Sequence, residues 1–199
     1  MARTQSKLYP EIRQGILKSA AELFARKGFS TTTIVDLAEA CNSSRGALYH
    51  YFASKEEILT RILEEHVSTM LTVLVDVGEQ RLEPKDHLRT VARTIMRMNS
   101  ENQSEQIVLL NDWNQLEEKK RQEIGAMQRR IVALIRDILS RLDHEHRMTP
   151  RFATSYAMSL LGSLNYTYAW FDPKGPVSAE DYADQVIDVF LNGFLSAPH

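Results

Sequence analysis

The sequence predicts an all-α protein of about nine helices, with a small N-terminal domain (residues 1–53) and a larger C-terminal domain (residues 54–199). Apolar residues recur at three- and four-residue spacings along most of the chain. Six prolines and eight glycines in 199 residues leave room for long helices, and strand-like alternation is rare. The contents of 43% hydrophobic and 25% charged residues are those of an ordinary globular chain.

Cysteine content and hydropathy exclude several classes of protein. The single cysteine, Cys41, rules out an internal disulfide framework and a multi-cysteine zinc site. The N-terminal stretch MARTQSKLYPEIRQ lacks the apolar core of a signal peptide. Apolar stretches such as 70–77 are far shorter than the ~20 residues that span a bilayer. We therefore expect a cytoplasmic protein without a membrane partner, metal or cofactor.

The N-terminal domain begins with an amphipathic helix over residues 12–27. Gly28 directly follows the cationic pair Arg26 and Lys27, which is typical of a helix C-terminus. Thr32 or Thr33 can then cap a short second helix over residues 34–40.

The next four residues, Cys-Asn-Ser-Ser at 41–44, predict a tight turn. Asn42 tolerates the positive φ that such a turn requires. Ser43 or Ser44 can cap a third helix over residues 45–52. Two short helices joined by such a turn, after a longer supporting helix, form a helix-turn-helix.

The C-terminal domain continues the helical pattern. Ser54 and Glu57 have the spacing of a capping box at the start of a helix that runs to about Gly78. Thr149 and Pro150 have the pattern of an N-cap and first helical residue. The further helices are expected at 84–98, 103–116, 117–142, 150–171 and from 178 onward.

Charge is distributed unevenly along the chain. Residues 1–55 carry a net charge of +4 and the remainder −6, within a total of −2. A basic head on an acidic body favours a nucleic-acid-binding module joined to a domain of another kind.

Residues 12–60 resemble the TetR family of transcriptional regulators. The resemblance lies in TTTIVDLA (31–38), SRGALYHYF (44–52) and SKEE (54–57). Members usually have glycine and an aliphatic residue in the turn, where this sequence has Asn42 and Ser43. The resemblance implies a DNA-binding regulator whose recognition helix, residues 45–51, enters the major groove.

The residue types on this segment suit contacts with double-stranded DNA. The guanidinium of Arg45 can pair with guanine, Gly46 permits close approach, and Tyr49 and His50 offer hydrogen-bond donors. Backbone N–H groups and the helix dipole at a helix N-terminus favour binding of a phosphate group. The predicted DNA-binding residues are Thr32, Thr33, Ser43, Ser44, Arg45, Gly46, Tyr49, His50 and Lys55.

A single helix-turn-helix contacts too little DNA for specificity, so we expect a homodimer on a palindromic operator. Small and apolar residues on the last two helices are candidates for an isologous four-helix interface, as the resemblance also implies. The alternative is that these helices are buried within one chain. The predicted interface residues are Ala157, Gly162, Tyr182, Val186, Val189, Phe190 and Phe194.

Aromatic, methionine and amide side chains of the body could line an effector pocket; the alternative is that they form the core. The text YAWFDPKGP at 168–176 resembles TetR members that respond to acyl-coenzyme A thioesters, which makes an acyl-CoA the implied small hydrophobic effector. The predicted pocket residues are Met96, Leu110, Asn111, Trp113, Met127, Ile131, Leu161, Asn165, Tyr168 and Trp170.

The leading interpretation is a repressor that its effector releases from DNA, and not an enzyme. One alternative is a DNA-binding dimer without an effector. A second is an all-helical enzyme using Asp112, Asp143, His144, Glu145 and His146. The i,i+2 spacing of the two histidines does not put both rings on one helical face. No catalytic motif supports the enzyme.

Overall fold

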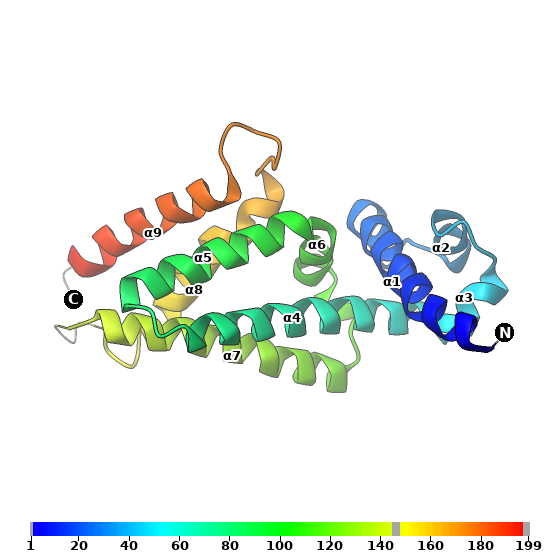
Figure 1. Ribbon diagram of the computed structural model, residues 1–199, viewed down its shortest axis with the longest axis horizontal. Coiled ribbons are helices and arrows are strands. Elements are labelled where there is room, and N and C mark those ends of the chain that lie inside the picture. Colours follow the sequence, from blue (N-terminus) through cyan, green and yellow to red (C-terminus); the bar gives the residue numbers. More distant parts are fainter. Residues whose placement is uncertain (1, 145–147, 197–199) are drawn as a thin grey trace. The chain divides into compact units, whose positions relative to one another are not determined.

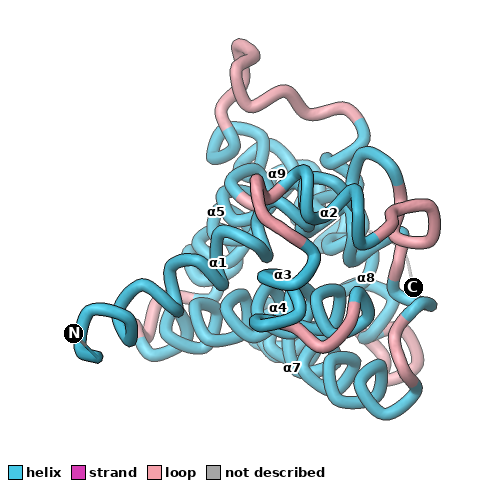
Figure 2. Tube along the Cα trace, turned by 90° about the vertical axis from the view of Figure 1, so that its right-hand side faces the viewer, coloured by secondary structure: helices cyan, strands magenta, loops and turns pink. Residues whose placement is uncertain are grey.

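The computed structural model describes the backbone of residues 2–144 and 148–196 and the side chains of residues 8–144 and 148–193. These residues form helices and loops without a strand (Figure 2), which confirms the predicted fold class. The elements are α1 (Ala2–Lys27), α2 (Ile34–Ala40), α3 (Arg45–Tyr51), α4 (Lys55–Glu79), α5 (Pro84–Glu101), α6 (Gln103–Asn111), η1 (Trp113–Gln115), α7 (Glu118–Leu142), α8 (Ala153–Asn165), η2 (Tyr166–Ala169) and α9 (Ala179–Ser196).

The chain divides into two compact units. The first joins the residues up to His66 with Ser104–Ile124, and the second joins Val67–Gln103 with the residues from Gly125 onward. Helices α4 and α7 contribute to both units. These units differ from the predicted division at residue 53, because the start of α4, α6 from Ser104 onward, η1 and the start of α7 belong to the first unit. The functional boundary at residue 53 stays a prediction.

In the first unit, α1, α2 and α3 pack around a small apolar core (Figure 1). Phe24, Leu37 and Leu48 are each at most 2% exposed. Burial of one such side chain stabilises the fold by about 1.5–3 kcal/mol. These three side chains fill the core, and the burial of Leu48 fixes which face α3 presents to solvent.

Capping residues set the bounds of α2 and α3. Thr33 Oγ1 accepts the Asp36 N–H at 3.1 Å, and Asp36 Oδ2 accepts the Thr33 N–H at 2.7 Å, which completes a capping box. Ser44 Oγ caps α3 by accepting the Ala47 N–H at 3.1 Å. Asn42 has a φ of 47°, as the predicted turn requires. The helix-turn-helix is thus confirmed with its turn residue.

Three predicted bounds are wrong. Helix α1 begins at Ala2 and continues through Pro10, which has no N–H to donate to an intrahelical hydrogen bond. Helix α6 ends at Asn111 and is followed by the separate turn η1. Helix α8 begins at Ala153, with Phe152 and not Thr149 as its N-cap. It gives way to η2, where Thr167 Oγ1 donates to the Leu164 carbonyl and competes for a helical acceptor.

In the second unit, α5 and α9 lie side by side (Figure 1). Arg89 donates to Asp188 at 2.6 Å, and Arg93 Nε donates to Asp184 at 2.7 Å. Because these carboxylates lie at the surface, each ion pair contributes modestly to stability. Within the described residues, no helix is both long enough and apolar enough to cross a membrane.

Candidate nucleic-acid interface and effector cavity

Helix α3 exposes one polar face. Its residues Arg45, Gly46, Tyr49 and His50 are exposed, with Tyr49 at 53%, while Leu48 on the opposite face is 2% exposed. The i, i+1, i+4 and i+5 spacing places the four exposed residues on one side of a helix. All four were predicted as DNA-binding residues, and the structure brings them together on a face that an external molecule can reach.

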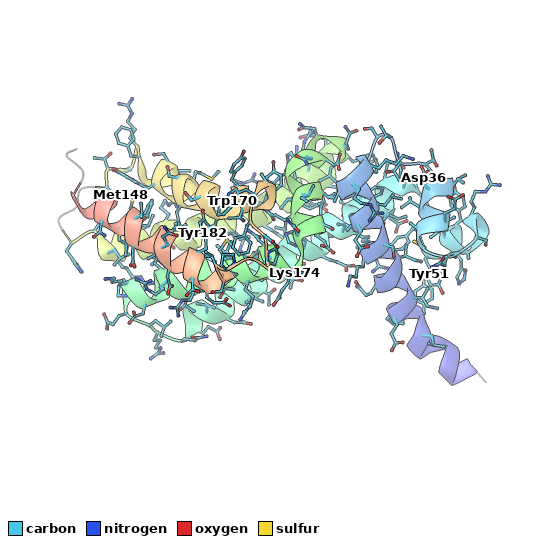
Figure 3. All side chains as sticks on the ribbon, turned by 90° about the horizontal axis from the view of Figure 1, so that it is seen from above. Asp36, Tyr51, Met148, Trp170, Lys174 and Tyr182 are labelled. Carbon is cyan, nitrogen blue, oxygen red and sulfur yellow. The ribbon has the colours of Figure 1, made fainter. Side chains whose placement is uncertain are left out.

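An aromatic cluster joins the N-terminal part of α1 to the end of α3. The Tyr9 ring lies 4.8 Å from the Tyr51 ring and 6.0 Å from the His50 ring, measured between centroids. Figure 3 labels Tyr51 within this unit. Such offset and edge contacts stabilise by about 0.5–1.5 kcal/mol each. The sequence analysis missed Tyr9, because it lies before the expected helix start at residue 12.

Threonine and serine residues at the helix starts have three different environments. Thr33 and Ser44 are exposed caps, and Ser43 is half-buried. Thr32 is only 1% exposed, and its Oγ1 donates to the Gly28 carbonyl at 2.7 Å. This hydroxyl closes the α1–α2 loop and is covered by the protein. The predicted contact of Thr32 with DNA, made at a helix N-terminus, stays a prediction.

Lys55 also holds this loop. Its ammonium donates to the carbonyls of Phe29 and Thr32, at 2.9 Å each, and lies 4.2 Å from the centre of the Phe29 ring. Two carbonyls and a ring face satisfy most of what an ammonium group can bind. Lys55 therefore ties the start of α4 to the loop before α2, and its predicted contact with phosphate stays a prediction.

Asp112, between α6 and η1, contacts the same loop. Its carboxylate accepts a hydrogen bond from the Phe29 N–H and feels the charge of Lys55, and both interactions favour the ionised form. Burial outweighs them and raises the pKa of Asp112. Phe29 thus connects three segments of the first unit: the loop after α1, the start of α4 and the end of α6.

Buried His66 of α4 contacts α6 as well. His66 Nε2 lies 3.0 Å from Gln106 Oε1, and both residues are less than 9% exposed. Burial lowers the pKa of His66, which keeps its imidazole neutral. Since the amide oxygen of Gln106 is an acceptor, the neutral ring donates from Nε2. This buried pair and the Asp112 contact attach α6 to the first unit at two points.

The second unit contains a small cavity between α5 and η2. Its volume, measured with a sphere the size of a water molecule, is about 10 Å³. It is lined by Met96, Asn99, Ser100, Gln103, Thr167, Tyr168, Phe171 and Pro173. Met96 and Tyr168 were predicted as effector residues, and Asn165, a third, contacts the lining residue Asn99.

The other predicted effector residues lie elsewhere. Leu110, Asn111 and Trp113 belong to the first unit, and the first two are exposed. In the second unit, Ile131 and Leu161 are buried in the core and Met127 is half-buried. Trp170 is 55% exposed, and its ring lies edge-on to Tyr182 at 5.0 Å, close to it in Figure 3.

Helices α8 and α9 carry exposed apolar side chains. Val189 is 70% exposed and Gly162 is exposed, whereas Tyr182, Val186 and Phe190 are half-buried. Ala157 is 0% exposed within the single chain, so its assignment to an interface is wrong. The side chain of Phe194 lies outside the described residues. The sequence analysis missed three exposed residues of this region: Phe152, Met158 and Tyr166.

The segment considered for an enzyme is only partly described. Among the described residues, no three or more His, Cys, Asp or Glu side chains gather where they could hold a metal ion. Asp143 is 6% exposed and accepts a hydrogen bond from the Met148 N–H, so it closes the turn that follows α7. Glu145 and His146 lie outside the described residues.

An exposed recognition helix in a helix-turn-helix, followed by a larger helical body, defines a helix-turn-helix regulator. The profile described as "Bacterial regulatory proteins, tetR family" matches residues 16–62, and that of the "Tetracyclin repressor-like, C-terminal domain" matches residues 81–194. The chain therefore belongs to the TetR family of transcriptional regulators, which confirms the resemblance inferred from residues 12–60.

Individual relatives agree with this assignment. The crystal structure of a TetR-family regulator from Bordetella parapertussis is 33% identical, covers 94% of this chain and 98% of its own, and has a TM-score of 0.88. The transcriptional repressor KstR2 of Mycobacterium tuberculosis is 22% identical over 91% of this chain and 92% of its own. The crystal structure of AibR in complex with isovaleryl coenzyme A and operator DNA is 24% identical. It covers 89% of this chain and 97% of its own, with a TM-score of 0.78.

Proposed function

We propose that this protein is a homodimeric repressor that binds a palindromic operator through α3 and is released by a small hydrophobic effector of the acyl-CoA class. The observation that carries the proposal is the exposed face formed by Arg45, Gly46, Tyr49 and His50, held outward by buried Leu48. Arg45 would read guanine in the major groove, and the other three residues would contact bases or phosphates. The exposed caps Thr33 and Ser44, with half-buried Ser43, flank this face.

The exposed apolar residues of α8, η2 and α9 support a dimer. Met158 of α8, Tyr166 of η2 and Val189 of α9 are each more than half exposed in the single chain. Large apolar side chains grouped on neighbouring helices commonly mark protein interfaces. An isologous interface formed by both helices would give the two-fold symmetry that a palindromic operator requires.

Two observations support an acyl-CoA effector. The segment 168–176 resembles that of acyl-CoA-responsive members, and AibR, a protein of the same fold, binds isovaleryl coenzyme A and operator DNA. Release from DNA would require the effector to bind the DNA-incompetent state more tightly. Phe29, in the loop before α2, contacts Lys55 at the start of α4 and Asp112 directly after α6. A movement of α4 or α6 would therefore be transmitted to this loop.

A DNA-release titration tests the effector proposal. The purified protein, bound to a fluorescent duplex that it selects from a random pool, is titrated with isovaleryl-CoA, decanoyl-CoA and free coenzyme A. The proposal predicts loss of fluorescence anisotropy with at least one acyl-CoA and none with free coenzyme A. Retention of the duplex at millimolar concentrations of both thioesters would instead support the alternative of a DNA-binding dimer without an acyl-CoA effector.

A further inference from the structure

Two tyrosine rings contact the exposed imidazole of His50. The ring centroids of His50 and Tyr51 lie 5.2 Å apart with an interplanar angle of 81°, and those of His50 and Tyr9 lie 6.0 Å apart with an angle of 83°. Both are edge-on arrangements, which aromatic rings favour over a face-to-face stack. Tyr9 and Tyr51 also contact each other, with centroids 4.8 Å apart. Each of these three rings therefore restricts the rotation of the other two.

Helix α1 is attached to the end of α3 independently of His50. Arg13 lies one helical turn after Tyr9, and its guanidinium carbon is 5.0 Å from the centre of the Phe52 ring. Arg13 Nη1 also donates to Glu65 of α4 at 2.9 Å. Phe52 directly follows α3 and is only 3% exposed. Because residues four apart share one face of a helix, the contact of Arg13 with buried Phe52 also sets where Tyr9 lies.

Burial does not explain the position of Tyr9. Its side chain is 40% exposed, and the neighbouring apolar residues of α1, Leu8 and Ile12, are 50% and 45% exposed. Side chains that keep so much of their surface in water add little to the core. Tyr9 differs from these two neighbours in having a ring, and this ring contacts a residue of the exposed face of α3.

Restriction of the His50 ring before binding has a consequence for affinity. A free surface side chain occupies several rotamers, and a partner that binds it must select one of them. This ordering weakens binding by about two- to tenfold for each side chain that is immobilised. The imidazole of His50, in contact with two rings in the free protein, has less freedom left to lose.

We propose that Tyr9 is a positioning residue of the DNA-binding face, which holds the His50 imidazole in the orientation in which α3 presents it to DNA. The inference rests on the proposed function, because it requires that α3 binds DNA. Tyr9 acts with its ring and through His50, and its hydroxyl makes no contact of its own with DNA. The DNA-binding face thus depends on a residue of α1 that lies outside the helix-turn-helix.

Variants of Tyr9 test the proposal in the full-length protein. Tyr9→Leu removes the ring, whereas Tyr9→Phe keeps the ring and removes only the hydroxyl. Fluorescence anisotropy is measured with a duplex that the wild-type protein selects from a random pool. We expect Tyr9→Leu to bind about three- to tenfold more weakly and Tyr9→Phe to bind like wild type. Leu8→Ala, which removes an exposed apolar side chain at the adjacent position, is the matched control and should also bind like wild type.

A double-mutant cycle separates positioning from a general structural role. His50→Ala removes the side chain on which Tyr9 is proposed to act. In this background Tyr9→Leu should cause no further loss of affinity, because no imidazole is left to position. If Tyr9 instead stabilised α3 as a whole, for example through Tyr51, the same loss would occur in both backgrounds. Circular dichroism of each variant verifies its helical content.

Nuclear magnetic resonance of the free wild-type protein tests the contact itself. With histidine and tyrosine rings labelled with carbon-13, we expect a nuclear Overhauser effect between the ring protons of His50 and Tyr9, whose centroids are 6.0 Å apart. The His50 resonance is identified by its absence from the spectrum of His50→Ala. This measurement needs no variant of Tyr9, so it remains decisive if Tyr9→Leu fails to fold.

Three results would overturn the proposal. They are the same loss from Tyr9→Leu with and without the His50 side chain, equal losses from Tyr9→Phe and Tyr9→Leu, and no Overhauser effect between the two rings in the folded free protein. Equal losses from the two Tyr9 variants would assign a DNA contact to the hydroxyl. A protein that binds no DNA would contradict the proposed function together with this inference, whereas additive losses on a duplex that wild type selects would contradict the inference alone.

Discussion

At the scale of single residues, Arg45 and Lys55 show two different environments of a positively charged side chain in the N-terminal domain. Arg45 is exposed on the outer face of α3, whereas the Lys55 ammonium is held by two backbone carbonyls. From the sequence alone the two residues look alike, since both lie at the start of a helix. Only the packing of Phe29 against Lys55 separates a candidate base-reading residue from a structural one.

For Arg45→Ala, we expect a loss of discrimination between operator and random DNA of about tenfold, because a bidentate contact with a base contributes about 1–3 kcal/mol. The melting temperature should stay unchanged, since the side chain is exposed. Fluorescence anisotropy with the operator duplex and with a random duplex measures the ratio of the two affinities. Arg97→Ala is the control, as Arg97 is an exposed arginine on α5. Equal losses on both duplexes would show that Arg45 acts on phosphate alone.

For Lys55→Met, we expect a lower melting temperature, because two charge-assisted hydrogen bonds and the contact with Phe29 are lost. Hydrogen bonds to charged groups contribute about 1.5–3 kcal/mol. The slope of log affinity for DNA against log salt concentration should stay unchanged, because both hydrogen bonds that the ammonium donates go to backbone carbonyls and not to phosphate. Lys18→Met, at an exposed position of α1, serves as control. A slope smaller by about one would restore the phosphate role.

At the scale of elements, the start of α2 depends on one carboxylate. Asp36 accepts hydrogen bonds from the Thr33 N–H and from Lys27, each at 2.7 Å. The Lys27 ammonium above all, and then the Thr33 contacts, hold the pKa of Asp36 far below its ordinary value of 3.8. A lowered folded-state pKa stabilises the fold above the ordinary value. That stabilisation is lost as pH falls through the folded-state value.

Asp36→Asn should therefore destabilise the protein at pH 7, and the difference from wild type should shrink as the pH is lowered from 7 to 3. Urea denaturation of both proteins at each pH measures this difference. Glu39→Gln, an exposed acidic residue of the same helix, is the control for loss of one negative charge. If the difference in free energy of unfolding between wild type and Asp36→Asn is the same at pH 7 and pH 3, the negative charge of Asp36 does not stabilise the start of α2.

Helix α8 shows what the sequence could and could not predict. The apolar spacing indicated a helix in this region, and the structure confirms it over Ala153–Asn165. The choice of face was less successful, because small residues occur on most of its circumference. Ala157 fits a close helix contact, and the structure buries it within its own chain, while Met158, the next residue, is half exposed. Which face of α8 is buried cannot be read from its local composition, because it depends on where α5 and α9 pack.

The DNA-binding region was predicted more completely because its signals are local. A capping box at Thr33, a positive φ at Asn42 and a cap at Ser44 each involve residues within three positions of one another. The contacts of Lys55 with Phe29 and of Tyr9 with Tyr51 join residues 26 and 42 positions apart, and no spacing rule identifies them. The predicted effector set likewise combines residues of two different compact units, because no local pattern tells which of these residues share a cavity.

At the scale of the whole molecule, the proposed function requires two copies. Val189→Asp places a charge on a side chain that is 70% exposed in the single chain and that the proposed dimer would bury. We expect this variant to sediment as a monomer and to bind the operator at least tenfold more weakly, with unchanged helical content. Ala126→Asp, at an exposed position of α7, is the control. Sedimentation of Val189→Asp at the same rate as wild type would place the interface elsewhere.

The central claim is that two copies of α3 read DNA together. Repeated selection of duplexes from a random pool by the purified protein, followed by sequencing, tests it most directly. The account predicts enrichment of a palindrome whose half-sites are centred one or more helical turns apart, and loss of this enrichment in Arg45→Ala. Recovery of no common sequence, or of the same palindrome with equal efficiency by Arg45→Ala, would contradict it.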